Sequence, residues 1–353
     1  MSTAIARGAT VVAADPRTDP RWRALAATAL GSLFTSPPWI RSVCDSYGFT
    51  PQARIVADGA GRPTDGFAWV PISDIRGDRL VSLPFSDRAE PLVANPATWT
   101  SLVDAALRTD APLQIRCLDA AVPTTDTRLV RTEAGTWHFT TLGAPVPEIY
   151  RSLRSSARRN IATADRNGVR VDTVTGMDGV RIYHRLHVSL RKYKYRLLAQ
   201  PLSLFERIWQ EFSVRDGIVT LLAHVNGEPV AGAVYLAWND VLYYKFGASL
   251  TGTLPLRPND ALAWTALRWA SERGFRLLDW GLSDLNQPGL IAYKRKWASQ
   301  EQRIVTLRSI SPTVDNKRGA GELLGELTRL LTEDAVPDHI TERAGCLLYR
   351  YFA

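Results

Sequence analysis

The dipeptide Asn226-Gly227 constrains the fold of this chain more than any other feature of its sequence. It separates two apolar runs, 218–226 and 229–238, that are typical of strands. Asn-Gly readily adopts the positive φ angles of a type I′ turn, so the two runs are predicted to pair as an antiparallel hairpin. A third strand, 241–248, follows after Asn239-Asp240. The second half of the chain therefore contains an antiparallel sheet.

Helical patterns surround this sheet, and a similar order of elements precedes it. In the second half we expect helices at 147–166, 177–191, 201–213 and 259–273, and strands at 169–174, 276–281 and 302–309. In the first half we expect helices at 20–30, 39–47 and 98–108, strands at 53–58, 66–72, 80–84, 113–118 and 136–140, and a polar loop at 120–135. A further helix is expected at 319–333.

Each half thus runs from helices through antiparallel strands to a helix and a strand, which suggests an old internal duplication. A chain of 353 residues also exceeds the size of one ordinary hydrophobic core. We therefore expect an α/β protein of two domains.

The charge of the chain is compatible with a polyanionic partner. The net charge is +8, and 37 of the 43 basic residues are arginines. Transfer RNA, a nucleotide-linked substrate, coenzyme A and anionic lipid would all suit this charge, but a surplus of surface arginine explains it equally well. Five of the six lysines fall between Lys192 and Lys296, which suggests that a compact ammonium is specifically required there.

Several classes of protein are disfavoured by what the sequence lacks. No apolar run approaches the roughly 18 residues that span a bilayer, and the first residues have no signal-like apolar core, so a cytoplasmic location is expected. The three cysteines are far apart and form no CxxC or Cys/His cluster, which argues against a disulfide framework and a zinc site. No nucleophile-elbow motif supports Ser-His-Asp hydrolysis.

Motifs between about 180 and 297 resemble those of the Fem family, whose members transfer amino acids from aminoacyl-tRNA to peptidoglycan precursors or to small amines. The most specific is LLDWGLSDLNQPGLIAYKRKWAS, in which a strand ends in Asp-x-Gly and is followed by Gly-Leu, an aromatic-Lys pair and a Trp. The others are LHVSLRKYK with His187 and Arg191, Pro201 and Phe205, AHVNGEPVAGAVYLAW, YYKFGAS and NDALAWTALRWASERG, with weaker matches in SLPFSDRAEPL (82–92) and AGCLLYRYFA (344–353).

The resemblance implies two tandem acetyltransferase (GNAT)-like domains with mixed, mostly antiparallel sheets flanked by helices. Residues 1–146 would form the first domain, on the acceptor side, and 312–353 would complete it. Residues 147–311 would form the second domain, on the donor side. The chain has no long insertion of heptads, so the helical arm of some family members is expected to be absent.

The resemblance also implies the main catalytic candidates. Tyr293-Lys294 matches an aromatic-Lys pair implicated in holding the 3′ end of the tRNA and stabilising the reacting ester. A fixed ammonium suits that role because attack of an amine on an ester creates an oxyanion; a solvated Lys beside a core Tyr is the alternative. Asp279 is a candidate general base, but an Asp at the end of a buried strand more often braces a turn.

Substrate-binding candidates come from three segments. Arg191 matches an Arg that contacts acceptor phosphates in relatives, and Lys194 and Arg196 extend the same basic cluster, which could equally be a surface loop. Tyr244 lies in the YYKFGAS motif. Asp87 and Glu90 in the segment 82–92 could line an acceptor pocket, on the resemblance alone.

A row of arginines is the candidate for tRNA binding. Arg151, Arg154, Arg158 and Arg159 are spaced so that one helical face could carry all four, although a solvated face fits equally well. His184 and His187 are three residues apart, as in a metal pair, but no carboxylate or Cys completes a ligand set, so we expect no metal.

The leading prediction is an aminoacyltransferase that uses aminoacyl-tRNA as co-substrate, needs no cofactor and forms an amide on a small-molecule or peptidoglycan-precursor amine. The second is acyl-CoA-dependent N-acyltransfer on the same fold. The segment SLTGTLPLRPNDAL disfavours it, because it lacks the paired glycines that cradle a pyrophosphate. A third is a non-catalytic binding module on an acyltransferase scaffold. The sequence does not indicate an oligomeric state.

Overall fold

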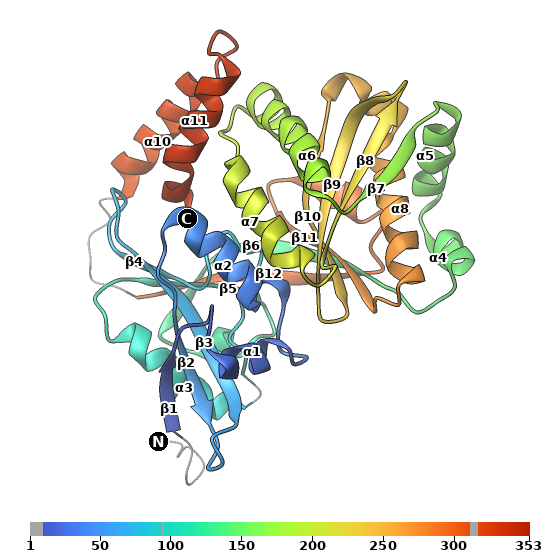
Figure 1. Ribbon diagram of the computed structural model, residues 1–353. Coiled ribbons are helices and arrows are strands. Elements are labelled where there is room, and N and C mark those ends of the chain that lie inside the picture. Colours follow the sequence, from blue (N-terminus) through green and yellow to red (C-terminus); the bar gives the residue numbers. More distant parts are fainter. Residues whose placement is uncertain (1–9, 94, 311–316) are drawn as a thin grey trace. The chain divides into compact units, whose positions relative to one another are not determined.

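The computed structural model describes residues 10–93, 95–310 and 317–353, and Figure 1 shows its elements. The chain divides into two compact units. The first comprises the residues up to 136, 302–322 and 353, and the second comprises 137–301 and 323–352. Strands β6 (Leu129–Thr141) and β12 (Gln300–Ser309) each run from one unit into the other along the chain.

The first unit is built on a mixed sheet. Its strand order is β1 (Thr10–Ala14), β2 (Gln52–Ala57), β3 (Pro63–Ile72), β4 (Arg79–Val81), β5 (Leu113–Leu118) and β12, with β4 and β5 parallel and the other neighbours antiparallel. Its helices are α1 (Pro20–Ala26), α2 (Pro37–Tyr47) and α3 (Pro96–Leu107). Phe67, Trp69 and Trp99 belong to one buried cluster that joins α3 to the sheet.

The second unit has five strands whose order is β11 (Leu277–Asp284), β10 (Val241–Ser249), β9 (Glu228–Trp238), β8 (Ile218–Val225) and β7 (Arg170–Val174). Only β10 and β11 are parallel; the other neighbours are antiparallel. The helices are α4 (Val146–Ser152), α5 (Ser155–Arg166), α6 (Met177–Ser189), α7 (Leu202–Ser213), α8 (Pro258–Glu272), α9 (Pro288–Lys294), α10 (Lys317–Leu331, which begins in the first unit) and α11 (Asp338–Leu348).

The sheet of the second unit is covered on both faces. Helices α5 and α8 lie over one face and α6 and α7 over the other (Figure 1). Leu221 of β8 and the alternating residues Ala231 and Ala233 of β9 belong to the same buried cluster as Leu267 of α8. On the opposite face Gly232 leaves room for Tyr183 of α6, because an added Cβ would lie 3.2 Å from its ring. The two-residue period of the strands therefore determines which helix each side chain contacts.

The predicted hairpin is confirmed. Val225 pairs with Glu228, and Asn226 and Gly227 both have positive φ, 52° and 85°. Two helix ends also follow from the local sequence: Ser36 accepts the Trp39 N–H at the start of α2, and Gly274 adopts φ 74° just after α8. The expected two-domain GNAT-like α/β fold, with mixed, mostly antiparallel sheets, is the fold observed.

Some elements differ from the prediction. The helix expected at 147–166 is interrupted, because Leu153 and Arg154 are extended, with ψ 148° and 146°. The loop expected at 120–135 already contains the start of β6 at Leu129. The short helices α9 and α11 were not predicted. None of the helices formed by the described residues has the length and apolar character needed to cross a bilayer.

The C-terminal tail was expected to complete the first domain, from 312 onwards. Residues 311–316 lie outside the described part of the chain. Of the rest, only the residues up to Glu322 and the terminal Ala353 group with the first unit, and 323–352 group with the second. Two contacts hold residues 323–352 to the second unit. Asp338 forms an ion pair with Lys192, and Gly345 lies so close to the Ala199 carbonyl that an added Cβ would approach it to 2.3 Å.

Candidate functional site

A cavity of about 320 Å³ opens in the second unit beside β10. Strands β10 and β11 pair in parallel from Val241 with Leu277 to Tyr243 with Asp279, and both strands then continue beyond these pairs, to Ser249 and Asp284. The cavity is lined by the far part of β10, by α9, by the first turn of α8 and by the turns at 190–195 and 251–256. All of the described residues that line it belong to the second unit.

A bulge in β10 gives the cavity one wall. The register with β9 shifts between Tyr244 and Phe246, so Tyr244 and Gly247 lie on the same side of the strand although they are three residues apart. A Cβ on Gly247 would lie 1.8 Å from the Tyr244 hydroxyl, so the phenol rests directly against the glycine. Desolvation raises the pKa of Tyr244 to about 12, which keeps the phenol protonated at neutral pH.

Lys294 ends α9 and lines the cavity. Its side chain is only 4% exposed, and its Nζ donates a hydrogen bond of 2.6 Å to the Leu282 carbonyl of β11. Beside it, Tyr293 donates from its hydroxyl to the Asn259 carbonyl at 3.0 Å, and Asn259 in turn donates to Ser249 at 3.1 Å. The expected Tyr293-Lys294 pair therefore lies at the cavity, and neither side chain is a solvated surface group.

The remaining wall comes from the segment Leu190–Tyr195, where Leu190, Lys194 and Tyr195 face the cavity. The Lys194 Nζ lies 5.3 Å from the centre of the Tyr195 ring. Lys194 and Lys294 thus bring two ammonium groups to a cavity whose described lining residues include no carboxylate. Such a lining favours a ligand that carries carbonyl oxygens or negative charge.

Arg191 and Arg196 do not line this cavity among the described residues. Arg191 donates from Nε to the Leu198 carbonyl at 2.9 Å, which closes the loop after its own helix. The Arg196 guanidinium forms two bonds to the Asp334 carboxylate, of 2.7 and 3.1 Å, and one to the Thr332 carbonyl. Their predicted contact with substrate remains a prediction, and both already have structural partners.

Asp279 is 2% exposed and accepts the Gly281 N–H at 2.7 Å. Gly281 has φ 74°, a conformation that favours glycine. This geometry favours the turn-bracing alternative for Asp279 over the general-base role.

The other two sets of candidates are not among the described residues that line the cavity. Glu90, in the first unit, accepts from Arg88 at 2.8 Å and from the Leu118 N–H at 3.0 Å, which is a structural arrangement; Asp87 is partly buried nearby in sequence. The predicted single arginine face is wrong, because the break at 153–154 puts Arg151 on α4, Arg154 at the junction, and Arg158 and Arg159 on α5. Arg158 donates to the Arg151 and Leu153 carbonyls and so closes the end of α4.

His184 and His187 both bond to Gln200, to its carbonyl at 3.0 Å and to its side-chain oxygen at 2.6 Å respectively. Burial, together with the nearby Arg191, lowers the pKa of His187 to about 3. Within the described residues no group of three His, Cys, Asp or Glu side chains is placed to hold a metal ion. The histidine pair therefore fixes the loop between α6 and α7.

Residues 151–295 match the model of the acetyltransferase (GNAT) domain family. A curated relative, the lipid II:glycine glycyltransferase of Staphylococcus haemolyticus, is 30% identical over 100 residues, which are 26% of this chain and 24% of that protein. The match therefore spans about a quarter of that relative. This match bears out, over those 100 residues, the resemblance to the Fem family that the motifs indicate.

Two solved structures share the fold. The crystal structure of FemX superposes with a TM-score of 0.63 at 12% identity, covering 87% of this chain and 98% of that one. The C-terminal domain of a putative lysylphosphatidylglycerol synthetase from Agrobacterium fabrum superposes with a TM-score of 0.52 at 11% identity, covering 88% and 94%. At these identities the likeness shows the fold alone.

The contact between Tyr244 and Gly247 can be tested by a double-mutant cycle. Gly247→Ala should lower the free energy of unfolding by about 1–3 kcal/mol, because the new methyl group overlaps the phenol. In a Tyr244→Leu background the same change should cost much less, because leucine lacks the overlapping atoms. Urea unfolding of the four proteins measures the coupling; additive costs would contradict the bulge geometry.

The low pKa of His187 predicts a pH dependence of stability. Below pH 6.5 the unfolded chain binds a proton on this residue, whereas the folded protein does not until about pH 3. Stability should therefore fall as the pH drops through this window, by up to about 1.4 kcal/mol per unit from this group. In His187→Asn this contribution is removed, so unfolding at pH 4.5–7 should show a shallower loss; an equal slope in both proteins would refute a buried neutral His187.

Proposed function

We propose that this relative of the Fem-type transferases is an aminoacyltransferase that joins the aminoacyl group of a charged tRNA to an amine acceptor. The observation that carries the proposal is the buried Lys294 ammonium at a cavity of the GNAT unit beside β10. The 30% identity to a lipid II:glycine glycyltransferase supports the reaction class.

The chemistry requires a cation at the reacting carbonyl. The acceptor nitrogen forms a bond to the carbonyl carbon of the ester, the carbonyl oxygen becomes negatively charged, and collapse breaks the bond to the 3′-oxygen of the tRNA. The acceptor nitrogen loses a proton, and the 3′-oxygen gains one. An ammonium carries three N–H donors; Lys294 gives one to the Leu282 carbonyl and lines the cavity. Lys294 would then stabilise the oxyanion.

The other cavity groups fit the rest of such a donor. Lys194, near the rim, would attract the phosphates of the tRNA end, and the exposed Tyr195 ring offers a surface on which a terminal base can stack. Tyr244 and Tyr293 are protonated at neutral pH, since desolvation raises the pKa of each phenol. They therefore act as hydrogen-bond partners, not as bases.

The acceptor is proposed as a peptidoglycan precursor or another small amine, and the reaction as a cytoplasmic one. The glycyltransferase relative acts on lipid II, according to its name. Acyl-CoA-dependent transfer is the second candidate because the GNAT domain match covers the cavity-forming segment. Against it, α8 is preceded by the turn Thr251–Leu256 and by Arg257 with φ 66°, in a segment that lacks paired glycines.

A donor competition tests the proposal. The full chain is incubated with an amine panel and either charged tRNA or acyl-CoA, and the mass change of each amine is measured. We expect a gain equal to an aminoacyl residue with charged tRNA only. Turnover with acyl-CoA and none with tRNA would establish the second candidate, and no turnover with either donor across the panel would count against catalysis.

Lys294 provides the sharper prediction. Lys294→Met keeps the length of the side chain but removes the charge, and it should reduce kcat about 100- to 1,000-fold through loss of oxyanion stabilisation. Lys294→Arg should not restore the rate, because a planar guanidinium cannot take the place of a compact ammonium between Leu282 and the cavity.

The matched control is Lys296→Met, two residues further on. Lys296 does not line the cavity among the described residues, and its Nζ lies 3.7 Å from Asp260. Transfer by this variant should stay within about threefold of the parent, which corresponds to less than about 1 kcal/mol. If Lys294→Met turned over at the parental rate with an unchanged melting temperature, the role given to Lys294 would be wrong.

A further inference from the structure

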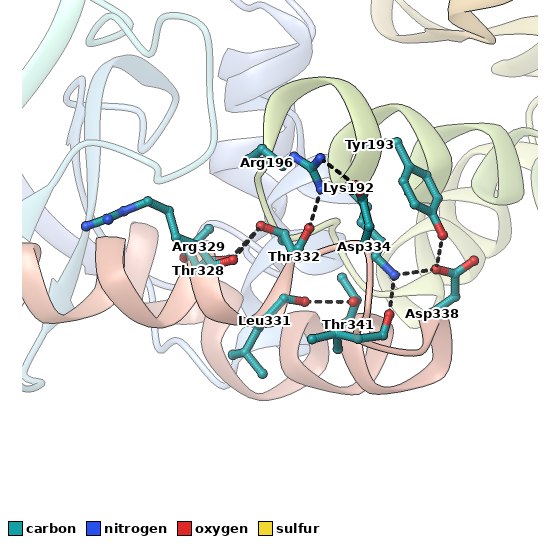
Figure 2. A network of polar contacts seen from close by, with 11 residues as sticks. Lys192, Tyr193, Arg196, Thr328, Arg329, Leu331, Thr332, Asp334, Asp338 and Thr341 are labelled. Carbon is teal, nitrogen blue, oxygen red and sulfur yellow. Dashed lines mark hydrogen bonds and ion pairs between the residues drawn. The ribbon is translucent and has the colours of Figure 1, made fainter.

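The segment Leu190–Tyr195 (η3) presents different residues on two sides. Leu190, Lys194 and Tyr195 line the cavity of the second unit. Lys192, Tyr193 and Arg196, from the same few residues, bond instead to the connection between α10 and α11, as Figure 2 shows. One short stretch of chain is therefore shared between the candidate site and the C-terminal tail, all within the second unit.

The bonds on the tail side involve charged groups at short distances. Lys192, which is 1% exposed, donates from Nζ to the Asp338 carboxylate at 2.6 Å and to the Val336 carbonyl. The Tyr193 hydroxyl donates to the same Asp338 oxygen at 2.7 Å. Arg196 forms its two bonds to Asp334 and a third, of 2.8 Å, to the Thr332 carbonyl. A buried ammonium without such a partner would be strongly destabilising.

The backbone of this segment is not one that its own sequence favours. Residues 190–195 form a π-helix, a rare conformation found mostly in single turns, and Arg196 has the left-handed conformation with φ 52° and ψ 47°. A non-glycine residue in that region is held at a cost by its surroundings. The contacts with the tail hold the backbone in this conformation, because the side chains of Lys192, Tyr193 and Arg196 all bond to the tail.

The tail is itself held in place on this side. Thr341 of α11 donates from its hydroxyl to the Leu331 carbonyl of α10 at 2.7 Å, which ties the two helices together (Figure 2). Gly345 lies against the Ala199 carbonyl, in the loop that follows η3. Asp338 is thus a fixed point on a packed helix pair, to which η3 is attached.

We infer that the C-terminal helix pair is a positioning element for the candidate site, and that Asp338 sets the place of Lys194 and Tyr195 at the cavity by holding Lys192 and Tyr193. Asp338 touches no cavity-lining residue in any bond described above, so it acts through its partners and is a positioning residue. The consequence for catalysis, although not the structural link, rests on the proposed aminoacyl transfer.

The electrostatics agree with a charged pair. The bond to Asp338 raises the pKa of Lys192 despite the opposing effect of its burial, and the bond to Lys192 lowers the pKa of Asp338. Both groups are therefore ionised across the neutral range. Removing the charge of Asp338 leaves the buried ammonium with neutral partners, and the segment η3 is the part that can move to solvate it.

Hydrogen exchange of the intact protein tests the structural link without reference to activity. In Asp338→Asn, the backbone amides of 190–197 should exchange about tenfold faster or more, since a charge-assisted bond that holds the segment is lost. Amides of β8 and β9 should keep their parental rates. Asp338→Glu, which retains the charge, should recover much of the protection. Unchanged exchange at 190–197 in Asp338→Asn would overturn the inference.

Kinetics then tests the role in positioning. We expect Asp338→Asn to raise KM for the charged tRNA about tenfold, equal to about 1.4 kcal/mol, while kcat changes by less than about threefold. Asp240→Asn is the matched control: it removes the same charge from an exposed ion pair with Arg276, at 2.6 Å, and should leave both KM and the exchange at 190–197 unchanged. Faster exchange in Asp338→Asn with an unchanged KM would overturn the positioning role.

The two hypotheses fail in distinguishable ways. If the parent protein transfers no aminoacyl group from charged tRNA, the proposed function fails, but the exchange experiment still decides whether Asp338 holds η3. If the parent is active and Asp338→Asn behaves as the parent in both measurements, the proposed function stands and the inference about the tail fails.

Discussion

The course of β10 beyond its pairing with β11 is the constraint on which the candidate site depends. Parallel pairing between them runs from Val241 to Tyr243, after which the strands continue past their last pair. The bulge between Tyr244 and Phe246 then changes which side chains share a face, so that Tyr244 lies against Gly247 beside the cavity. Strand β10 thereby provides a shaped wall of the cavity.

Buried cations are the second organising feature, and each is held by a different kind of partner. Lys294 donates to a backbone carbonyl of β11. Lys192 is matched by the carboxylate of Asp338. The ion pair of Lys192 serves the structure, whereas Lys294 lines the cavity.

Much of the fold could be predicted from the sequence because the local conformational preferences of many residues agree with the conformations that they adopt in the tertiary structure. Asn226-Gly227 forms the hairpin that its turn preference predicts, and Ser36 and Gly274 mark helix ends by their own side-chain or backbone chemistry. The break at Leu153-Arg154 and the π-helix at 190–195 escaped prediction. Their residues carry no helix-breaking signal, and the guanidinium of Arg158 and the contacts of the tail hold the backbone there from outside.

For the candidate site, the sequence by itself determined the chemistry that is available: an aromatic-Lys pair after an Asp-x-Gly strand end, a basic cluster near 191–196, and a tyrosine and a glycine three residues apart in YYKFGAS. Only the tertiary structure decided which of these groups meet. It brings Lys294, Tyr293, Tyr244 and Lys194 to one cavity, ties Arg196 to Asp334 and closes the Asp279 turn onto Gly281. The physical reason is that a side chain's role depends on its burial and its partners, and distant parts of the chain supply both.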